Sequence, residues 1–261
     1  MRYFDSHAHY YDERFESEYE GSVEDLVGAL LSDSVSYIIN VGTSVETSRL
    51  AIKQARRHAN MYTALGIHPS DTRFLSNMES ELADIESLIR NKENKCVVLG
   101  EIGLDYHYPD TDKERQMRYF TAQMELADLL GIPVCIHDRD AHEDVMSVVR
   151  RFSRVRGVMH SFSGSPEMAE ELVRLGYMVS FSGTISFTNA RRPKEAAARL
   201  PHDSVLIETD CPYLAPHPYR GTLNHSGNLK YTCAALAAAI GESEEYTADI
   251  TEKNAKRLFG L

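Results

Sequence analysis

Eight short apolar runs recur along this chain of 261 residues, and each ends in a polar residue before a stretch with helical spacing begins. The runs are Tyr3–Asp5, Tyr37–Gly42, Met61–Ile67, Cys96–Ile102, Pro133–Ile136, Gly157–Met159, Met178–Phe181 and Val205–Ile207. Short apolar strands that alternate with helices predict a parallel sheet. Eight such units in about 250 residues favour one closed (β/α)8 TIM barrel that spans residues 1–261 as a single hydrolase domain.

The stretches between the runs carry apolar residues at helical spacing, as in 23–30 and 117–130. The stretch after Gly241 predicts a terminal helix with Thr251 as its N-cap and Phe259 in its apolar stripe. An open doubly wound sheet is the weaker alternative. It prefers a glycine-rich phosphate turn after the first strand, whereas Asp-Ser-His-Ala-His stands there in this chain.

Charge and cysteine usage limit the partners and the compartment. The formal net charge of −11 argues against binding of polyanions through a general basic field. The four cysteines form no C-x-x-C pair and are expected to be reduced thiols. No apolar run approaches the roughly 20 residues of a membrane span, and the N-terminal residues are polar where a signal peptide would be apolar. We therefore expect a cytoplasmic protein with no membrane contact and no obligate protein partner.

Ligand-type side chains stand where the runs end, which in a barrel is the edge that carries the active site. Most of the runs end in imidazole or carboxylate groups, and the second and seventh do not. These groups are His7 and His9 after the first run, His68 after the third, Glu101 at the fourth, His137 at the fifth, His160 at the sixth and Asp210 at the eighth.

This set of side chains predicts a metal centre. Strand side chains alternate with period two, so His7 and His9 share one face and can chelate one ion. A lone histidine at a strand end is more often structural, but ligand-type residues at five strand ends outweigh that alternative. Imidazole with carboxylate suits zinc, manganese, iron or nickel, whereas oxygen-only sets suit magnesium or calcium. Two divalent ions that share Glu101 as a bridge would use every ligand; zinc, manganese and magnesium are the candidates.

Two further carboxylates are predicted to orient the ligands. By alternation, Asp5 lies one layer below His7, and Glu208 one layer below Asp210. Each would orient an imidazole or the bridging water, although a structural hydrogen bond inside the barrel is an equally open interpretation. Cys135, one layer below His137, is expected to pack in the core. No base for a nucleophilic thiol stands beside Cys211.

At this level of detail the chain resembles the TatD-related deoxyribonucleases of the metal-dependent amidohydrolase superfamily, essentially from end to end. The resemblance is carried by the order and completeness of seven motifs. They are D-S-H-A-H (Asp5 to His9), G-I-H-P (Gly66 to Pro69), G-E-I-G-L-D-Y (Gly100 to Tyr106), I-H-D-R-D-A (Ile136 to Ala141), H-S-F-S-G (His160 to Gly164), E-T-D-C-P-Y-L-A-P (Glu208 to Pro216) and N-A-K-R-L-F (Asn254 to Phe259).

The resemblance implies a two-metal site and a reaction. The first ion would be held by His7, His9, Glu101 and Asp210, and the second by Glu101, His137 and His160. The implied activity is hydrolysis of phosphodiester bonds in DNA, often from a 3′ end. One loop departs from the family pattern, because Arg220-Gly221 is followed by Thr222–Ser226 and lacks the usual acidic-proline pair. This departure bears on substrate preference and not on the ligands.

From these observations we expect two-metal hydrolysis of DNA ends or short oligonucleotides. Asp210 would hold the attacking water and accept its proton, and Glu101 would bridge the ions. His68 and Arg139 follow strand ends and are candidates to contact the phosphate, although Arg139 is equally suited to a surface ion pair.

Two alternatives remain open from the sequence. One is a hydrolase of carbon–nitrogen or carboxylic and lactone ester bonds on the same centre. Relatives that cleave cyclic amides often use a carboxylated lysine at the end of strand four, where this chain has Glu101, and Lys95 lies at the opposite end of that strand. The other is a binding or scaffold protein without turnover, which would be expected to have lost ligands.

Overall fold

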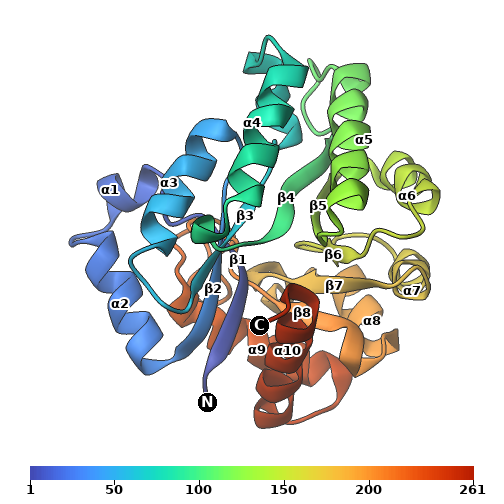
Figure 1. Ribbon diagram of the computed structural model, residues 1–261. Coiled ribbons are helices and arrows are strands. Elements are labelled where there is room, and N and C mark those ends of the chain that lie inside the picture. The colour runs from blue at the N-terminus through green and yellow to red at the C-terminus, as the bar shows by residue number, and fades with distance from the viewer.

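The computed structural model describes all 261 residues and contains eight parallel strands that follow one another in sequence order around the molecule (Figure 1). They are β1 (Tyr3–Ala8), β2 (Val35–Val41), β3 (Met61–Leu65), β4 (Cys96–Asp105), β5 (Val134–Arg139), β6 (Gly157–Met159), β7 (Tyr177–Phe181) and β8 (Val205–Ile207). A parallel bridge between Ala8 and Cys211 joins the last segment to the first. The predicted (β/α)8 barrel is therefore confirmed.

Helices surround the strands, as Figure 1 shows. They are α1 (Arg14–Glu18), α2 (Val23–Asp33), α3 (Val45–Ala55), α4 (Met78–Arg90), α5 (Lys113–Leu130), α6 (His142–Arg151), α7 (Pro166–Arg174), α8 (Arg191–Arg199), α9 (Leu229–Ile240) and α10 (Glu244–Phe259). Side-chain oxygens cap many of them; Ser44 and Thr47 at the start of α3 form a reciprocal capping box. None of these helices combines the length and the apolar character needed to cross a membrane.

The predicted start of the last helix was wrong. Helix α10 begins at Glu244, and its N-cap is Ser243, whose hydroxyl accepts a hydrogen bond from the backbone N–H of Tyr246. Thr251 lies inside the helix, where its hydroxyl donates to the carbonyl of Thr247 at 2.8 Å. A threonine can return its hydroxyl to the preceding turn in this way, so a capping residue type in mid-helix is not a start signal.

The barrel interior is apolar at the end where the strands begin. Phe4, Val98 and Leu206 belong to one buried cluster with Phe259 of α10. The rings of Phe4 and Phe259 stack with their centroids 5.8 Å apart, so the last helix covers the end of the barrel where β1 begins. A larger cluster of 40 buried residues fills the space between the strands and the outer helices. These two cores give the polar side chains at the opposite end a rigid support.

Candidate metal centre

The structure brings the six predicted ligands together at the end of the barrel where the strands finish. They are His7 and His9 from β1 and its exit, Glu101 from β4, His137 from β5, His160 after β6 and Asp210 after β8. One placement differs from the prediction, since Glu101 lies in the middle of its strand and β4 continues to Asp105. This extension places a further carboxylate beside the cluster.

Close backbone approach beneath the cluster explains two of the glycines in its motifs. A Cβ atom on Gly66 would lie 2.8 Å from the backbone of Gly100. A Cβ atom on Gly100 would in turn lie 2.7 Å from the side chain of Cys135. Only glycine permits β3, β4 and β5 to pack this closely, and that packing determines where Glu101 emerges between its neighbours.

The two carboxylate oxygens of Glu101 face different groups of imidazoles. Oε1 lies 2.8 Å from Nδ1 of His137 and 2.9 Å from Nε2 of His160. Oε2 lies 3.2 Å from Nε2 of His7 and 3.8 Å from Nε2 of His9. Glu101 therefore lies between two sets of nitrogen donors, which is the arrangement that a bridging carboxylate requires.

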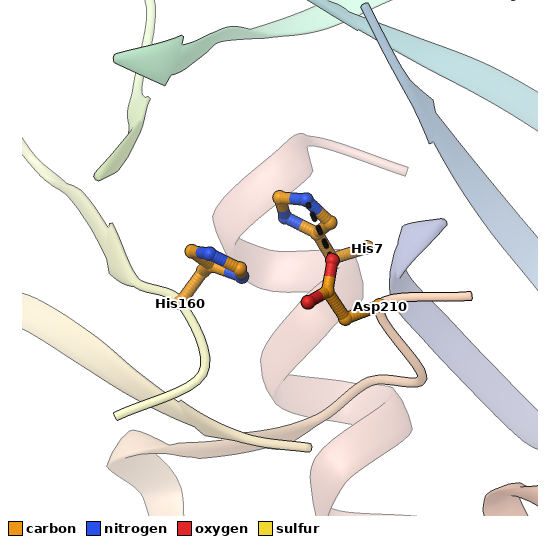
Figure 2. Close-up of side chains that lie close together, drawn as sticks. All are labelled: His7, His160 and Asp210. Atoms are coloured by element: carbon orange, nitrogen blue, oxygen red, sulfur yellow. Dashed lines mark ion pairs between the residues drawn. The ribbon is translucent and has the colours of Figure 1, made fainter. Parts of the chain in front are cut away.

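Asp210 completes the group around His7 and His9. Figure 2 shows its carboxylate directed at the ring of His7, with His160 alongside. Oδ1 of Asp210 lies 3.7 Å from Nε2 of His7 and 3.4 Å from Nε2 of His9. The rings of His7 and His160 stack with centroids 4.0 Å apart, so the two halves of the cluster touch. Asp210 adopts a left-handed conformation with φ 56, which aspartate tolerates better than most residues.

The spacing of the donor atoms fits divalent metal ions. Four donors held at about 2.1 Å around a tetrahedral ion lie about 3.4 Å apart. Nε2 of His7 and Nε2 of His9 lie 3.0 Å apart, and their distances to Oε2 of Glu101 and Oδ1 of Asp210 run from 3.2 to 3.8 Å. Nε2 of His137 is buried without a hydrogen-bond partner, as expected of a nitrogen at a ligand site. The residues present therefore suit a metal centre.

Electrostatics keep both central carboxylates ionised. Burial alone would raise the pKa of Glu101, but the imidazoles of His160, His68 and His7 outweigh it and hold this pKa well below its usual range. Burial opposes ionisation of Asp210 too, and its hydrogen bond with His9 together with the neighbouring imidazoles lowers its pKa. Both groups therefore have the charge that a cation ligand needs.

Glu208 holds one of the ligand imidazoles. Its Oε1 lies 3.0 Å from Nδ1 of His160 and accepts a hydrogen bond of 2.8 Å from the backbone N–H of Ser161. Nε2 of His160 is thereby directed toward Glu101. This is the contact expected of a carboxylate that orients a ligand histidine.

Asp5 orients no ligand imidazole and makes structural hydrogen bonds inside the barrel, which is one of the two interpretations that the sequence left open. The register of β1 shifts between Asp5 and Ala8, which removes the strict alternation. The carboxylate of Asp5 instead accepts hydrogen bonds from the hydroxyls of Thr209 and Ser226, each at 2.6 Å, and from the backbone N–H of Thr209 at 3.0 Å. Asp5 thus holds the segment that carries Asp210 and touches no imidazole.

Replacement of Asp5 with alanine should lower the free energy of unfolding by about 3 kcal/mol, because it leaves several buried donors without an acceptor. Ser36→Ala is the matched control. Ser36 is also buried, but its hydroxyl makes one hydrogen bond, to the carbonyl of Tyr3, and its loss should cost about 1 kcal/mol. Urea denaturation of both variants measures the difference, and equal midpoints would contradict the role assigned to Asp5.

His68 and Asp105 extend the cluster beyond the six predicted ligands. His68, expected to contact phosphate, has its Nε2 3.5 Å from Oε1 of Glu101, and burial lowers its pKa to about 3. Asp105 was missed, although it stands in the G-E-I-G-L-D-Y motif, because the strand was predicted to end earlier. Its Oδ2 lies 3.5 Å from Nε2 of His137.

Arg139 and the loop at 222–226 lie outside the cluster. Arg139 is exposed, and its guanidinium lies over the ring of Tyr108 at 5.7 Å from the ring centroid. In the loop, the amide of Asn224 donates to the carbonyls of Thr209 at 2.9 Å and Tyr213 at 2.8 Å. The loop that departs from the family pattern therefore supports the Asp210 segment from the side.

Metal uptake at neutral pH should release protons. Burial lowers the pKa of His137, but the carboxylates of Asp105 and Glu101, 3.5 Å and 2.8 Å from its two ring nitrogens, outweigh burial and raise this pKa to about 9. His137 is therefore protonated at pH 7 without metal and must lose its proton to bind an ion. Apparent metal affinity should rise by about tenfold per pH unit for each proton released, until the pH passes this value. Calorimetry in buffers of different ionisation enthalpy counts the protons.

His142→Gln is the control for this count. The hydrogen bond to Asp138 also raises the pKa of His142. This side chain does not face the cluster. The variant should release as many protons as the wild type. Metal binding at pH 7 without proton release would show that His137 is not a ligand.

A parallel (β/α)8 barrel with this histidine and carboxylate cluster at its mouth defines a metal-dependent hydrolase. Comparison with known proteins then identifies the family. The model of the family described as TatD related DNase matches residues 4–260, so the chain belongs to that family, as the sequence motifs indicated.

Similar proteins cover the whole chain. It is 37% identical over 260 residues to YabD of Bacillus subtilis, with 99% of both chains covered. It is 33% identical to YcfH of Escherichia coli, with 98% of this chain and 95% of YcfH covered. Both relatives are named uncharacterized metal-dependent hydrolases. The crystal structure of YjjV, a TatD homolog from Escherichia coli K12, superposes with a TM-score of 0.89 at 29% identity, covering 100% of this chain and 98% of that one.

Proposed function

We propose that this protein hydrolyses phosphodiester bonds at the ends of DNA strands with two divalent metal ions. His7, His9, Glu101 and Asp210 would hold one ion, and Glu101, His137 and His160 the other. The observation that carries the proposal is the position of Glu101, whose two oxygens face separate sets of imidazoles. Membership of a family described as TatD related DNase supports a phosphodiester as the bond that is hydrolysed.

The chain's own residues supply the base and the positioning. Bound ions would polarise the phosphoryl oxygens and acidify the attacking water. Asp210, ionised and 3.4 Å from His9, accepts the proton of that water. Glu208 keeps His160 in place through a hydrogen bond to its far nitrogen. Asp5 fixes the backbone beside Asp210 through Thr209.

The space above the cluster suits a strand end. Two cavities of about 680 and 1050 Å³ meet at His68, His137, His160 and Asp210. The cluster lies at the floor where they join, and its Glu101, His9 and His160 side chains are nearly fully buried. A flexible single strand can enter such a recess, whereas the continuous side of a duplex would meet its rim first.

The structure offers no group for a carboxylated lysine bridge of the kind some cyclic-amide hydrolases use. Lys95 precedes β4 at its far end, and its ammonium donates to the carbonyls of Ala55, His58 and Ala59. Glu101 occupies the position between the two donor sets. This favours phosphodiester hydrolysis over the carbon–nitrogen alternative without relying on the fold.

A time course on end-labelled single-stranded, duplex and circular DNA tests the proposal, run in manganese or magnesium beside a cyclic amide and a lactone. We expect stepwise release of nucleotides from one end, fastest on single strands, and full loss of activity with a chelator. Faster turnover of the amide or lactone would overturn the nuclease. Equal cutting of circular and linear DNA would replace end cleavage with internal cleavage.

A further inference from the structure

The recess over the metal cluster has two arms whose exposed charges differ in sign. The larger cavity, of about 1050 Å³, is lined by Arg139, Arg191 and Arg192 together with Tyr108 and Phe187. Asp105 and Asp138 also line it, but their side chains are only 4% exposed; we call this side the arginine arm. The smaller cavity, of about 680 Å³, is lined by Asp12, Glu46 and Asp71 and by no lysine or arginine; we call it the acidic arm. Both include His68, His137, His160, Asp210 and Tyr213, so the arms meet at the cluster.

Two cations of the arginine arm are free to bind an anion. Arg139 and Arg192 are exposed and form no ion pair with a carboxylate, whereas Arg191 pairs with Glu195 at 2.7 Å. Arg220 adds charge nearby, since its guanidinium lies 4.4 Å from the centroid of the Phe187 ring. The exposed guanidinium groups therefore form a local cationic patch on a protein whose overall charge is negative.

Aromatic faces lie among these cations. Tyr108 is 48% exposed and lies under Arg139. Phe187 is half-buried at the wall of the same cavity. Guanidinium groups interleaved with aromatic rings are the combination that holds single-stranded nucleic acids, because phosphates contact the cations while bases stack on the rings. Neither feature depends on base identity.

Resting on the proposed function, we propose that the arginine arm binds the retained single strand of the DNA, with its phosphates on Arg139 and Arg192 and a base on Phe187. The acidic arm then receives the nucleotide that is cut off. A second phosphate beyond the cluster would lie among Asp12, Glu46 and Asp71, where like charges repel it. The bond that reaches the cluster is therefore the last one of the strand, which favours release of single nucleotides.

The test compares a 12-residue oligothymidylate with thymidine 5′-(p-nitrophenyl phosphate), which has no retained strand. Arg192→Gln should raise KM for the oligonucleotide by about 10-fold, the loss of one charge-assisted contact. The slope of log affinity against log salt should fall by about 0.7. Phe187→Leu should raise KM by about 5-fold or more through lost stacking. In both variants kcat/KM for the oligonucleotide should fall relative to kcat/KM for the nucleotide ester.

Arg174→Gln is the matched control. Arg174 is exposed and free of ion pairs, and it ends α7 at the opposite face of the barrel. It should leave both substrates and the salt slope unchanged. If the wild type cleaves the oligonucleotide but Arg192→Gln behaves like Arg174→Gln, the proposal that the arginine arm binds the strand is wrong, and the proposed nuclease function still stands. If the wild type cleaves no oligonucleotide with any divalent metal, the proposed function is wrong, and so is the role proposed for the arginine arm.

Discussion

Asp210→Asn should reduce kcat on single-stranded DNA by about 10²–10⁴-fold, the range for loss of a general base. Asparagine keeps the size of the side chain, one oxygen and tolerance for the left-handed backbone at this position. It cannot accept the proton of the attacking water, because its pKa lies far outside the working range. KM should change far less than kcat, since the loss falls on the transition state. Steady-state kinetics under saturating metal measure both.

Asp140→Asn is the control for this variant. Asp140 also follows a strand end and has a left-handed backbone, with φ 57. Its carboxylate is exposed and pairs with His107 at 3.1 Å, away from the cluster. This variant should keep wild-type kcat. Equal losses in the two variants would mean that removal of negative charge near the mouth, and not proton transfer at Asp210, causes the effect.

Glu101→Gln should remove metal from both halves of the centre. Glutamine lacks the charge that the two donor sets share, and its amide nitrogen would face imidazoles at one side. We expect metal affinity to fall by more than about 100-fold, the upper end for loss of a group that only orients a ligand. Activity should fall with it. Elemental analysis and calorimetric titration give the stoichiometry of the variant.

His160→Ala provides the comparison for Glu101→Gln. Nε2 of His160 faces Oε1 of Glu101 and the second set of donors. Its loss should empty one half of the centre and leave the group of His7, His9 and Asp210 able to bind. Full occupancy in the glutamine variant, or an equal loss in both variants, would show that Glu101 does not bridge.

The barrel and the composition of the cluster were predictable because both depend on local sequence. Apolar runs of strand length carry their own signal, and residues that end parallel strands must meet at one edge. Thus the sequence alone predicts that His137 and Asp210, 73 positions apart by their numbers, lie together. The distances that make Glu101 face two donor sets depend on the packing at Gly66 and Gly100, which no pattern shows.

The sequence was least informative where one strand leaves ideal geometry. Alternation along β1, where the register shifts, could not decide between the two interpretations of Asp5, and the contacts with Thr209 and Ser226 support the structural one. The unexpected length of β4 hid Asp105, because a strand end was assumed right after Glu101. The pairing of neighbouring strands decides the register of β1 and the length of β4, and the pattern of apolar residues in the sequence does not predict either.

The role proposed for Arg139 and the uneven distribution of exposed charge around the cluster depend on the three-dimensional structure and could not be predicted from the sequence. Arg139 is far in sequence from Phe187 and Arg192, and they share one wall only because the end of β5 and the segment leading into α8 lie beside the same mouth. The net charge of the chain suggested weak attraction to DNA. It could not show that the arginines gather on one side of the cluster, while the other side has carboxylates and no arginine or lysine.

We infer that this mouth holds two divalent ions with Glu101 between them. Crystals grown with manganese and measured at an energy where manganese scatters anomalously would locate the ions. We expect two anomalous peaks, one beside Oε2 of Glu101 in contact with His7, His9 and Asp210, and one beside Oε1 in contact with His137 and His160. A single peak under saturating manganese, or two peaks that do not share Glu101, would contradict this inference.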